Sequence, residues 1–174
     1  MTKFVVLVDE SGKPTGLEEK MAAHEKGLLH AAFSIFVFNK EGEFLLQRRA
    51  ASKYHSGGLW TNTCCSHPRK GEDAARGAHR RLREEMGFDC PLREVYSFTY
   101  KAKLDHGLTE HEFDHVFFGD YDGPVNPNLE EVDEYRWISL DALEKEVKAK
   151  PGEFTEWFKV TLPEMLRHRK SAKR

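Results

Sequence analysis

An amphipathic helix lies between β-rich segments in this sequence, and that order limits the folds open to the chain. Within residues 72–86, Ala74, Ala78, Leu82 and Met86 recur on one face at 100° per residue, and Gly87 suits a C-terminal cap. A helix of this kind buries its apolar stripe against another layer. The pattern therefore predicts a mixed α/β fold.

Strand and helix signals alternate irregularly along the rest of the chain. β-rich runs separated by polar turns predict strands at residues 3–8, 33–38, 44–47, 95–103, 110–121 and 135–138. Helices are expected at residues 140–150 and 154–162, where Pro163 should bend or restart the second helix. Residues 11–16 are interpreted as a turn and residues 18–25 as one or two helical turns. We therefore expect one domain over residues 1–174, a mixed β-sheet with helices packed on both sides.

The composition is that of a globular protein, and it argues against two kinds of partner. The chain has 174 residues, of which 39% are hydrophobic and 32% charged, and its formal net charge is −2. Such a chain lacks the overall positive field that suits nucleic acid. No apolar run approaches the roughly 18–20 residues that span a bilayer. We therefore expect neither a nucleic-acid nor a membrane partner.

The three cysteines, Cys64, Cys65 and Cys90, indicate where the protein works. Their number is odd and two are adjacent, which makes a poor disulfide framework. Residues 1–9 are too short and too soon acidic to serve as a signal peptide. Free thiols are typical of a reducing compartment, so the expected location is the cytoplasm.

The helix of residues 72–86 carries charges where apolar residues are expected. Arg81 and Glu85 project onto the same side as the apolar stripe. A carboxylate there is costly unless it is paired or bound to a metal. One interpretation is an ion pair between the two, one helical turn apart. The other is a metal ligand, Glu85, beside a phosphate-binding arginine.

A second unusual segment is Thr61-Asn62-Thr63-Cys64-Cys65-Ser66-His67-Pro68. On an extended segment, a cysteine and a histidine two residues apart share one face. This could form half of a zinc site or place a reactive thiol beside an imidazole. The simpler interpretation is that the cysteines are small buried residues, which we expect for at least one of them.

The segment Glu110-His111-Glu112-Phe113-Asp114-His115 contains the H-E-x-x-H pattern of zinc proteases, which requires a helix. The residues that follow favour a strand instead. On a strand, His111 and His115 point one way and Glu110 and Glu112 the other. Two carboxylates on one face either raise a pKa or hold a hard cation. An exposed charged strand face is the alternative.

The histidines outside these segments are less informative. His24 and His30 are six residues apart and need a loop to converge. Nine histidines are present, so most cannot be ligands. We assign no function to His55, His79, His106 and His168.

Taken together, these segments resemble the type I isopentenyl-diphosphate isomerases, a branch of the Nudix fold. The resemblance extends from about Leu7 to about Trp157. The number of its landmarks and their order along the chain make it specific. The landmarks are residues 19–24, 29–34, 47–53, 58–68, 80–87, 110–112 and 154–157. The helix of residues 72–87 resembles a degenerate Nudix box whose first position lies before the helix. Ser66 stands where the first glycine of the box is usual, and Arg81 stands where a glutamate is usual. These departures weaken a hydrolase interpretation, because the box normally gathers carboxylates around cations that activate water.

The resemblance implies an isomerase that interconverts isopentenyl and dimethylallyl diphosphate in isoprenoid biosynthesis, transposing a C=C bond through a carbocation. It implies Cys65 and Glu112 as the catalytic acid/base pair, Tyr100 as a hydroxyl bonded to the glutamate, and Trp157 as an aromatic face over the hydrocarbon. It implies one Mn²⁺ or Zn²⁺ held by His24, His30, His67, Glu110 and Glu112. It implies a diphosphate-bound Mg²⁺ at Glu85 and the main-chain oxygen of Cys65. The groups implied to grip the diphosphate are Lys20, Arg49, Lys53 and Arg81.

The chemistry of the implied reaction suits these residue types. Protonating an alkene gives a tertiary carbocation, so an acid is needed on one face and a base on the other. The π face of Trp157 stabilises a cation by roughly 0.5–2 kcal/mol. The expected partner is therefore a small allylic or homoallylic diphosphate, and we expect a monomer or weak homodimer.

Three other functions compete with this hypothesis. A Nudix diphosphohydrolase would leave residues 65–67 and 110–112 unexplained. A zinc protease built on His111, Glu112 and His115 lacks a third ligand, since Tyr121 stands at the usual downstream spacing. A catalytically inactive binding module is disfavoured because Cys65, Glu112 and the five ligand positions are intact.

Overall fold

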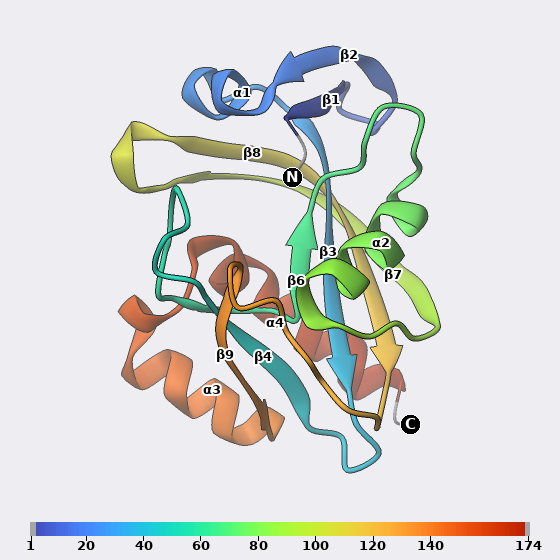
Figure 1. Ribbon diagram of the computed structural model, residues 1–174, viewed down its shortest axis with the longest axis vertical. Helices are drawn as coiled ribbons and strands as arrows, with labels where there is room; N and C mark the ends of the chain where they lie inside the picture. Colours follow the sequence, from blue (N-terminus) through green and yellow to red (C-terminus); the bar gives the residue numbers. More distant parts are fainter. Residues whose placement is uncertain (1–2, 173–174) are drawn as a thin grey trace.

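The computed structural model describes residues 3–172, so the outermost residues of the expected domain, 1–2 and 173–174, lie outside the description. Its strands belong to one mixed sheet that is flanked by helices (Figure 1). The strands are β1 (Phe4–Val8), β2 (Pro14–Glu19), β3 (His30–Phe38), β4 (Phe44–Arg49), β5 (Trp60–Thr61), β6 (Cys64–Ser66), β7 (Leu92–Lys103), β8 (Thr109–Asp120) and β9 (Val132–Ile138). The helices are α1 (Lys20–Lys26), α2 (Ala74–Met86), α3 (Leu140–Ala149), α4 (Glu156–Ala172) and the 3₁₀ turns η1 (Asp105–Gly107) and η2 (Pro151–Glu153).

Strand β3 is the centre of the sheet. It runs parallel to β8 along its whole length and antiparallel to β6, and β8 continues into an antiparallel pair with β7. Strand β4 joins β3 only at Phe38 and Phe44 and then diverges to pair with β9 and β5. Because β3 has a neighbour on each side and a helical layer over each face, all nine of its residues are buried.

Two hydrophobic clusters lie on the two faces of the sheet, one beneath α2 and one beneath α3 and α4 (Figure 1). Alternation along β3 divides its side chains between them: Phe33 and Ile35 face α2, whereas Phe36 and Phe38 face α4. The expected mixed sheet with helices on both sides is therefore confirmed. None of the helices within residues 3–172 is long and apolar enough to cross a membrane.

Local signals placed most elements correctly, but the short strands β5 and β6 were not expected and two further expectations differ from the structure. Helix α2 begins at Ala74, because the Asp73 side chain accepts from the backbone N–H of Arg76, and it ends at Gly87 in the left-handed conformation. Residues 14–19 were expected partly as a turn but form β2, which gains backbone hydrogen bonds from β1. The expected restart at Pro163 is wrong. Helix α4 continues to Ala172, because its apolar face stays packed on the sheet through Leu162, Met165 and Leu166.

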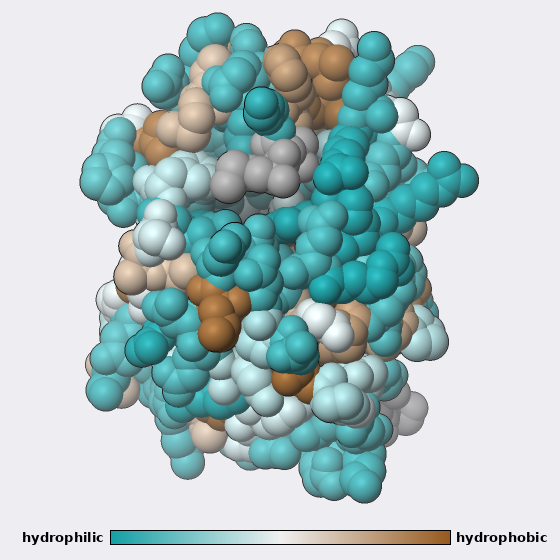
Figure 2. All heavy atoms as spheres, in the orientation of Figure 1, coloured by the Kyte–Doolittle hydropathy of each residue, from teal (hydrophilic) through white to brown (hydrophobic). Residues whose placement is uncertain are grey.

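The molecular face seen in Figure 2 is mostly hydrophilic, with a small hydrophobic patch over β1 and β2. Phe4 and Leu17, one from each of these strands, are exposed by 56% and 42%. The pairing of β1 with β2 leaves the outer edge of β2 at the end of the sheet.

Candidate active site

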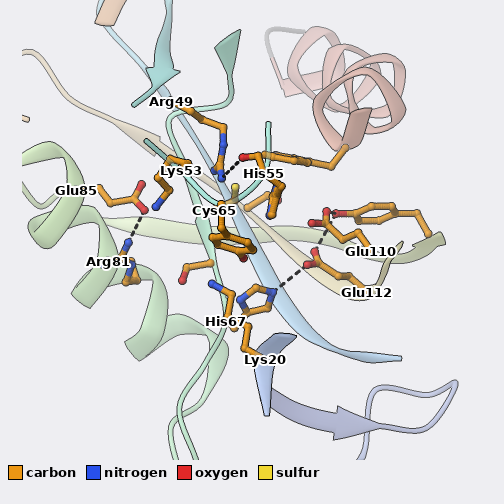
Figure 3. A pocket seen from close by; sticks show the side chains of 15 residues that line it. Lys20, Arg49, Lys53, His55, Cys65, His67, Arg81, Glu85, Glu110 and Glu112 are labelled. Atoms are coloured by element: carbon orange, nitrogen blue, oxygen red, sulfur yellow. Dashed lines mark hydrogen bonds and ion pairs between the residues drawn. The ribbon is translucent and has the colours of Figure 1, made fainter. Parts of the chain in front are cut away.

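The polar cavity is built on the face of the sheet that α4 covers, and strand register explains which side chains reach it. Cys65 on β6 lies opposite Ser34 on β3, and Glu112 on β8 lies opposite His30 on β3. Directly paired residues project to the same face of a sheet. The thiol and the carboxylate therefore enter one space from the two strands that flank β3, and both line the same cavity (Figure 3).

The β8 segment with the H-E-x-x-H pattern is a strand, as expected. Glu110, Glu112 and Asp114 are buried and alternate with the half-buried His111 and His115. His111 bonds to the carbonyl of Gly27, and His115 pairs with Glu94, so neither faces the cavity. The extended backbone excludes a helical zinc-protease site, and the burial excludes the exposed charged face.

Three histidines converge on Glu112 from three separate elements. Nε2 of His67 lies 2.9 Å from Oε1 of Glu112, and Nε2 of His30 lies 3.4 Å from the same oxygen. Nε2 of His30 is also 3.3 Å from Nε2 of His67. His24 reaches the group from α1, with ring centroids 5.1 Å from His30 and 5.8 Å from His67.

The donor set fits a divalent cation that prefers nitrogen and oxygen ligands. One ligand atom from each of His24, His30, His67 and Glu112 lies within 4.8 Å of the others, and all four residues are buried. Nε2 of His24 has no hydrogen-bond partner among the described residues, although the ring is fully buried. A buried imidazole nitrogen without a partner is costly, and a cation would satisfy it. Neutral imidazole with carboxylate suits zinc or manganese.

The two carboxylates of β8 share a hydroxyl donor. Tyr100 on β7 lies opposite Glu112 and donates to Oε2 of Glu112 at 2.9 Å, while it also contacts Glu110. Burial raises the pKa of Glu110, and the adjacent Glu112 charge adds to that shift. Burial also opposes the charged form of Glu112, but hydrogen bonds from His30 and His67 hold its pKa below the usual value. Of the two carboxyl groups, Glu110 is therefore the one that holds a proton more readily.

Cys65 and Trp157 complete the walls of the cavity. Desolvation raises the pKa of the Cys65 thiol, and the Arg49 guanidinium partly opposes this effect. Trp157, in the first turn of α4, is buried, and the Arg49 guanidinium lies 5.1 Å from its ring centroid. The partner of Cys65 in sequence, Cys64, points to the other face and packs beneath α2, as expected for one of the two cysteines.

The Arg81–Glu85 ion pair is present, with Nη2 of Arg81 2.5 Å from Oε1 of Glu85. The same guanidinium also binds Glu84 at 2.6 Å and Glu131 at 2.7 Å. The Arg81 charge holds the pKa of Glu85 below its usual value despite burial. Both residues line the cavity, at the end away from the histidines (Figure 3).

Lys20, Arg49 and Lys53 line the cavity together with Arg81, so the cations expected to hold a diphosphate meet in one place. Partial burial and the neighbouring charges of Lys53 and Arg49 lower the pKa of Lys20 to about 8. Packing cations this closely is unfavourable without an anion between them. The cluster therefore suits a multiply charged anion.

Sequence reasoning missed two residues at this site. His55, to which no function was assigned, is buried in the cavity wall. Gln47 donates to Oε2 of Glu85 at 3.0 Å and to the carbonyl of Thr63 at 2.9 Å. Gln47 stands at the fourth position of β4, and its neighbours in the sequence do not distinguish it from a glutamine on an exposed strand. Only its burial in the structure reveals the contact with Glu85.

Comparison with known proteins shows the family and the fold of this chain. The NUDIX domain family model matches residues 28–158. Isopentenyl-diphosphate Delta-isomerase 2 of Photorhabdus laumondii is 54% identical over 91% of this chain and 90% of its own length. Isopentenyl-diphosphate Delta-isomerase 2 of Aromatoleum aromaticum is 52% identical over 95% of this chain and 88% of its own. The crystal structure of DR0079 from Deinococcus radiodurans shares the fold, with a TM-score of 0.69, 18% identity, and coverage of 84% of this chain and 89% of that one.

The fold and the matched residues define a Nudix-domain protein whose cavity holds a thiol, a histidine cluster and paired carboxylates. Within that superfamily, the chain belongs to the isopentenyl-diphosphate Delta-isomerases.

Proposed function

We propose that this protein interconverts isopentenyl diphosphate and dimethylallyl diphosphate, with Cys65 and Glu112 as the acid/base pair. The observation that carries the proposal is that both groups line one cavity from the two strands flanking β3. The relatives named isopentenyl-diphosphate Delta-isomerase support the reaction. The three free thiols support a location in the cytoplasm.

The substrate's charged end is held away from the reacting carbons. Lys20, Arg49, Lys53 and Arg81 bind the diphosphate, and Arg81 also pairs with Glu85 beside it. Binding energy from this remote end positions the alkene between the two catalytic groups. Charge-assisted hydrogen bonds to phosphate oxygens are strong and directional, which suits this anchoring role.

The double-bond shift needs one proton added and another removed. Protonation of the terminal alkene carbon breaks the π bond and leaves a tertiary cation at the neighbouring carbon. Loss of a proton from the next carbon on the other side forms the new double bond. Cys65 and Glu112 give and take these two protons, so each turnover shifts one proton from one group to the other. The proton must then return before the next turnover.

Other side chains stabilise the charged states in this cycle. Tyr100 fixes the orientation of Glu112 and supports its charge. Trp157 offers its π face to the cation, and Arg49 and Trp157 close that side of the cavity to water. When bound, Mn²⁺ or Zn²⁺ at His24, His30, His67, Glu110 and Glu112 would orient the carboxylates and tune their acidity, and Mg²⁺ at Glu85 and the Cys65 carbonyl would neutralise diphosphate charge.

Incubation with isopentenyl diphosphate in heavy water tests the proposal. Dimethylallyl diphosphate containing deuterium should accumulate, as followed by NMR, and chelation of divalent ions should stop the exchange. Cys65→Ala and Glu112→Gln should each abolish exchange while diphosphate binding is largely kept. Release of phosphate without isomerisation would favour a hydrolase instead. Near-normal turnover in either variant would remove that residue from the mechanism.

A further inference from the structure

His55 is the buried cavity residue for which the proposed mechanism has no use. It lies in the loop between β4 and β5, and the residue is only 4% exposed. Its ring meets the Trp157 ring edge-on, with centroids 5.6 Å apart, and stacks at 30° on His24, with centroids 6.1 Å apart. The His55 imidazole therefore contacts both the Trp157 ring and the His24 ring of the histidine cluster.

The loop holds His55 in place by contacts on both sides. Nη2 of Arg49 donates to the His55 carbonyl at 3.1 Å. The backbone N–H of Ser56 donates to the Asp105 carboxylate, at 3.2 and 3.3 Å from its two oxygens. Ser56 has a φ of 53°, a left-handed conformation that is unfavourable for a non-glycine residue. Such a conformation persists only where surrounding contacts enforce it, so the position of His55 is specifically built.

In both His55 and His24, Nδ1 is engaged in a hydrogen bond, which leaves Nε2 of each ring for another partner. Nδ1 of His55 lies 3.2 Å from the Ser56 hydroxyl, and Nδ1 of His24 lies 2.7 Å from the Lys20 carbonyl. No hydrogen bond to the Nε2 of either ring is formed by the described residues, and that of His24 is wholly buried. Glu110 bonds to Tyr100 through Oε1 and retains a second oxygen. One ligand atom from each of His24, His55 and Glu110 lies within 4.8 Å of the other two.

We propose that His55 is a further ligand of the divalent cation, reaching it from the Trp157 side together with His24 and Glu110. This inference rests on the proposed function, since it enlarges the same cation site. His24 also belongs to the group that it forms with His30, His67 and Glu112, so the two groups share one imidazole, and together they offer six donor residues. Bonds of about 2.1 Å to nitrogen place opposed imidazole nitrogens about 4.2 Å apart. The ligand atoms of His24, His55 and Glu110 lie within 4.8 Å of one another, which is compatible with that separation.

Four imidazoles and two carboxylates favour a borderline cation such as zinc over magnesium or calcium, which prefer oxygen. The contact with Trp157 has a second consequence. Binding through Nε2 would fix the plane of the His55 ring and, through it, the edge against which Trp157 packs. The cation site and the hydrocarbon wall are thereby joined through one residue.

A structural role for His55 is the alternative, and His55→Phe distinguishes the two. Phenylalanine keeps an aromatic ring against Trp157 but has no ligand atom. His106→Phe is a matched control, because its side chain is 73% exposed and does not line the cavity. Apoprotein of each variant is titrated with Zn²⁺ against a chromophoric chelator. We expect His55→Phe to weaken zinc binding roughly tenfold or more, and His106→Phe to leave it unchanged.

A second measurement uses the wild-type protein and so does not depend on folding of a variant. Nitrogen-15 NMR of the imidazole side chains should show the Nε2 resonance of His55 shifting when one equivalent of Zn²⁺ binds. An unshifted His55 resonance, or equal zinc affinity in His55→Phe and wild type, would overturn this inference. His24→Ala separates this inference from the proposed function. If both His24→Ala and His55→Phe bind zinc normally, the whole cation site is wrong. If only His24→Ala loses zinc binding, the cation site stands and only the role of His55 is refuted.

Discussion

The Tyr100 hydroxyl donates to Oε2 of Glu112 at 2.9 Å, across the register pair that joins β7 to β8. Both residues are buried, so the hydroxyl has no access to bulk water as an alternative partner. Hydrogen bonds to a charged group contribute about 1.5–3 kcal/mol. Tyr100→Phe should therefore lower kcat roughly 10- to 100-fold with a smaller change in KM, measured by the conversion of isopentenyl diphosphate.

Tyr96→Phe provides the control for this variant, because Tyr96 sits on the same strand and its hydroxyl bonds to Thr161 instead. The Tyr96→Phe variant should keep the kcat of the wild type. An unaltered kcat in Tyr100→Phe would show that the contact with Glu112 plays no part in the chemical step.

Gln47 should set the magnesium requirement of the enzyme. Its amide donates to Glu85, and replacement by Met keeps the volume but removes the donor. Partners that orient a ligand typically change metal affinity 10- to 100-fold. Gln47→Met should raise the Mg²⁺ concentration needed for binding of inorganic pyrophosphate by about tenfold, measured by calorimetry. Zinc affinity should stay constant, and a parallel fall in zinc affinity would indicate a general loss of structure.

Gly77 on α2 should not tolerate a methyl group. A Cβ there would lie 2.8 Å from Cε1 of Phe33 and 3.0 Å from Oε2 of Glu72. Alanine normally favours a helix by about 1 kcal/mol, but overpacking a core costs about 1–3 kcal/mol. Gly77→Ala should therefore lower Tm in thermal unfolding. Gly152→Ala, where nothing lies within 4 Å, is the control, and a higher Tm for Gly77→Ala would contradict the packing.

Glu72 and Arg80 should make acid stability depend on one ion pair. Two guanidinium nitrogens of Arg80 donate to Glu72 at 2.8 and 2.9 Å, and these bonds lower the Glu72 pKa below its usual 4.5. Because the pKa of Glu72 is lower in the folded than in the unfolded state, the ion pair stabilises the fold at pH values above the unfolded-state pKa. This stabilisation is lost as the pH falls through the native pKa. Glu72→Gln should cost about 1–2 kcal/mol near neutral pH.

Urea unfolding over a series of pH values measures this effect. The difference in the free energy of unfolding between wild type and Glu72→Gln should become smaller as the pH falls below about 4.5. Arg80→Met combined with Glu72→Gln completes a double-mutant cycle. A difference that stays constant with pH would mean that the charge of Glu72 contributes nothing.

Local patterns in the sequence were sufficient for much of this structure. The period of two along residues 110–115 placed Glu110 and Glu112 on one face, because strand geometry alone determines that alternation. The stripe of α2 and its Gly87 cap follow from helical periodicity in the same way. The resemblance to a known family then gathered the cavity residues that no local pattern connects.

What the sequence by itself determined is therefore most of the longer elements and the face on which their side chains lie, since both follow from the periodicity of each segment. Tertiary structure decided which faces meet. Gln47 reaches Glu85 across 38 positions of sequence, and His55 meets His24 and Trp157 only because a loop crosses the cavity. Likewise, β2 forms because β1 offers it backbone partners, and α4 passes Pro163 because the sheet holds its apolar face. Such contacts depend on the packing of whole elements, which has no local signature.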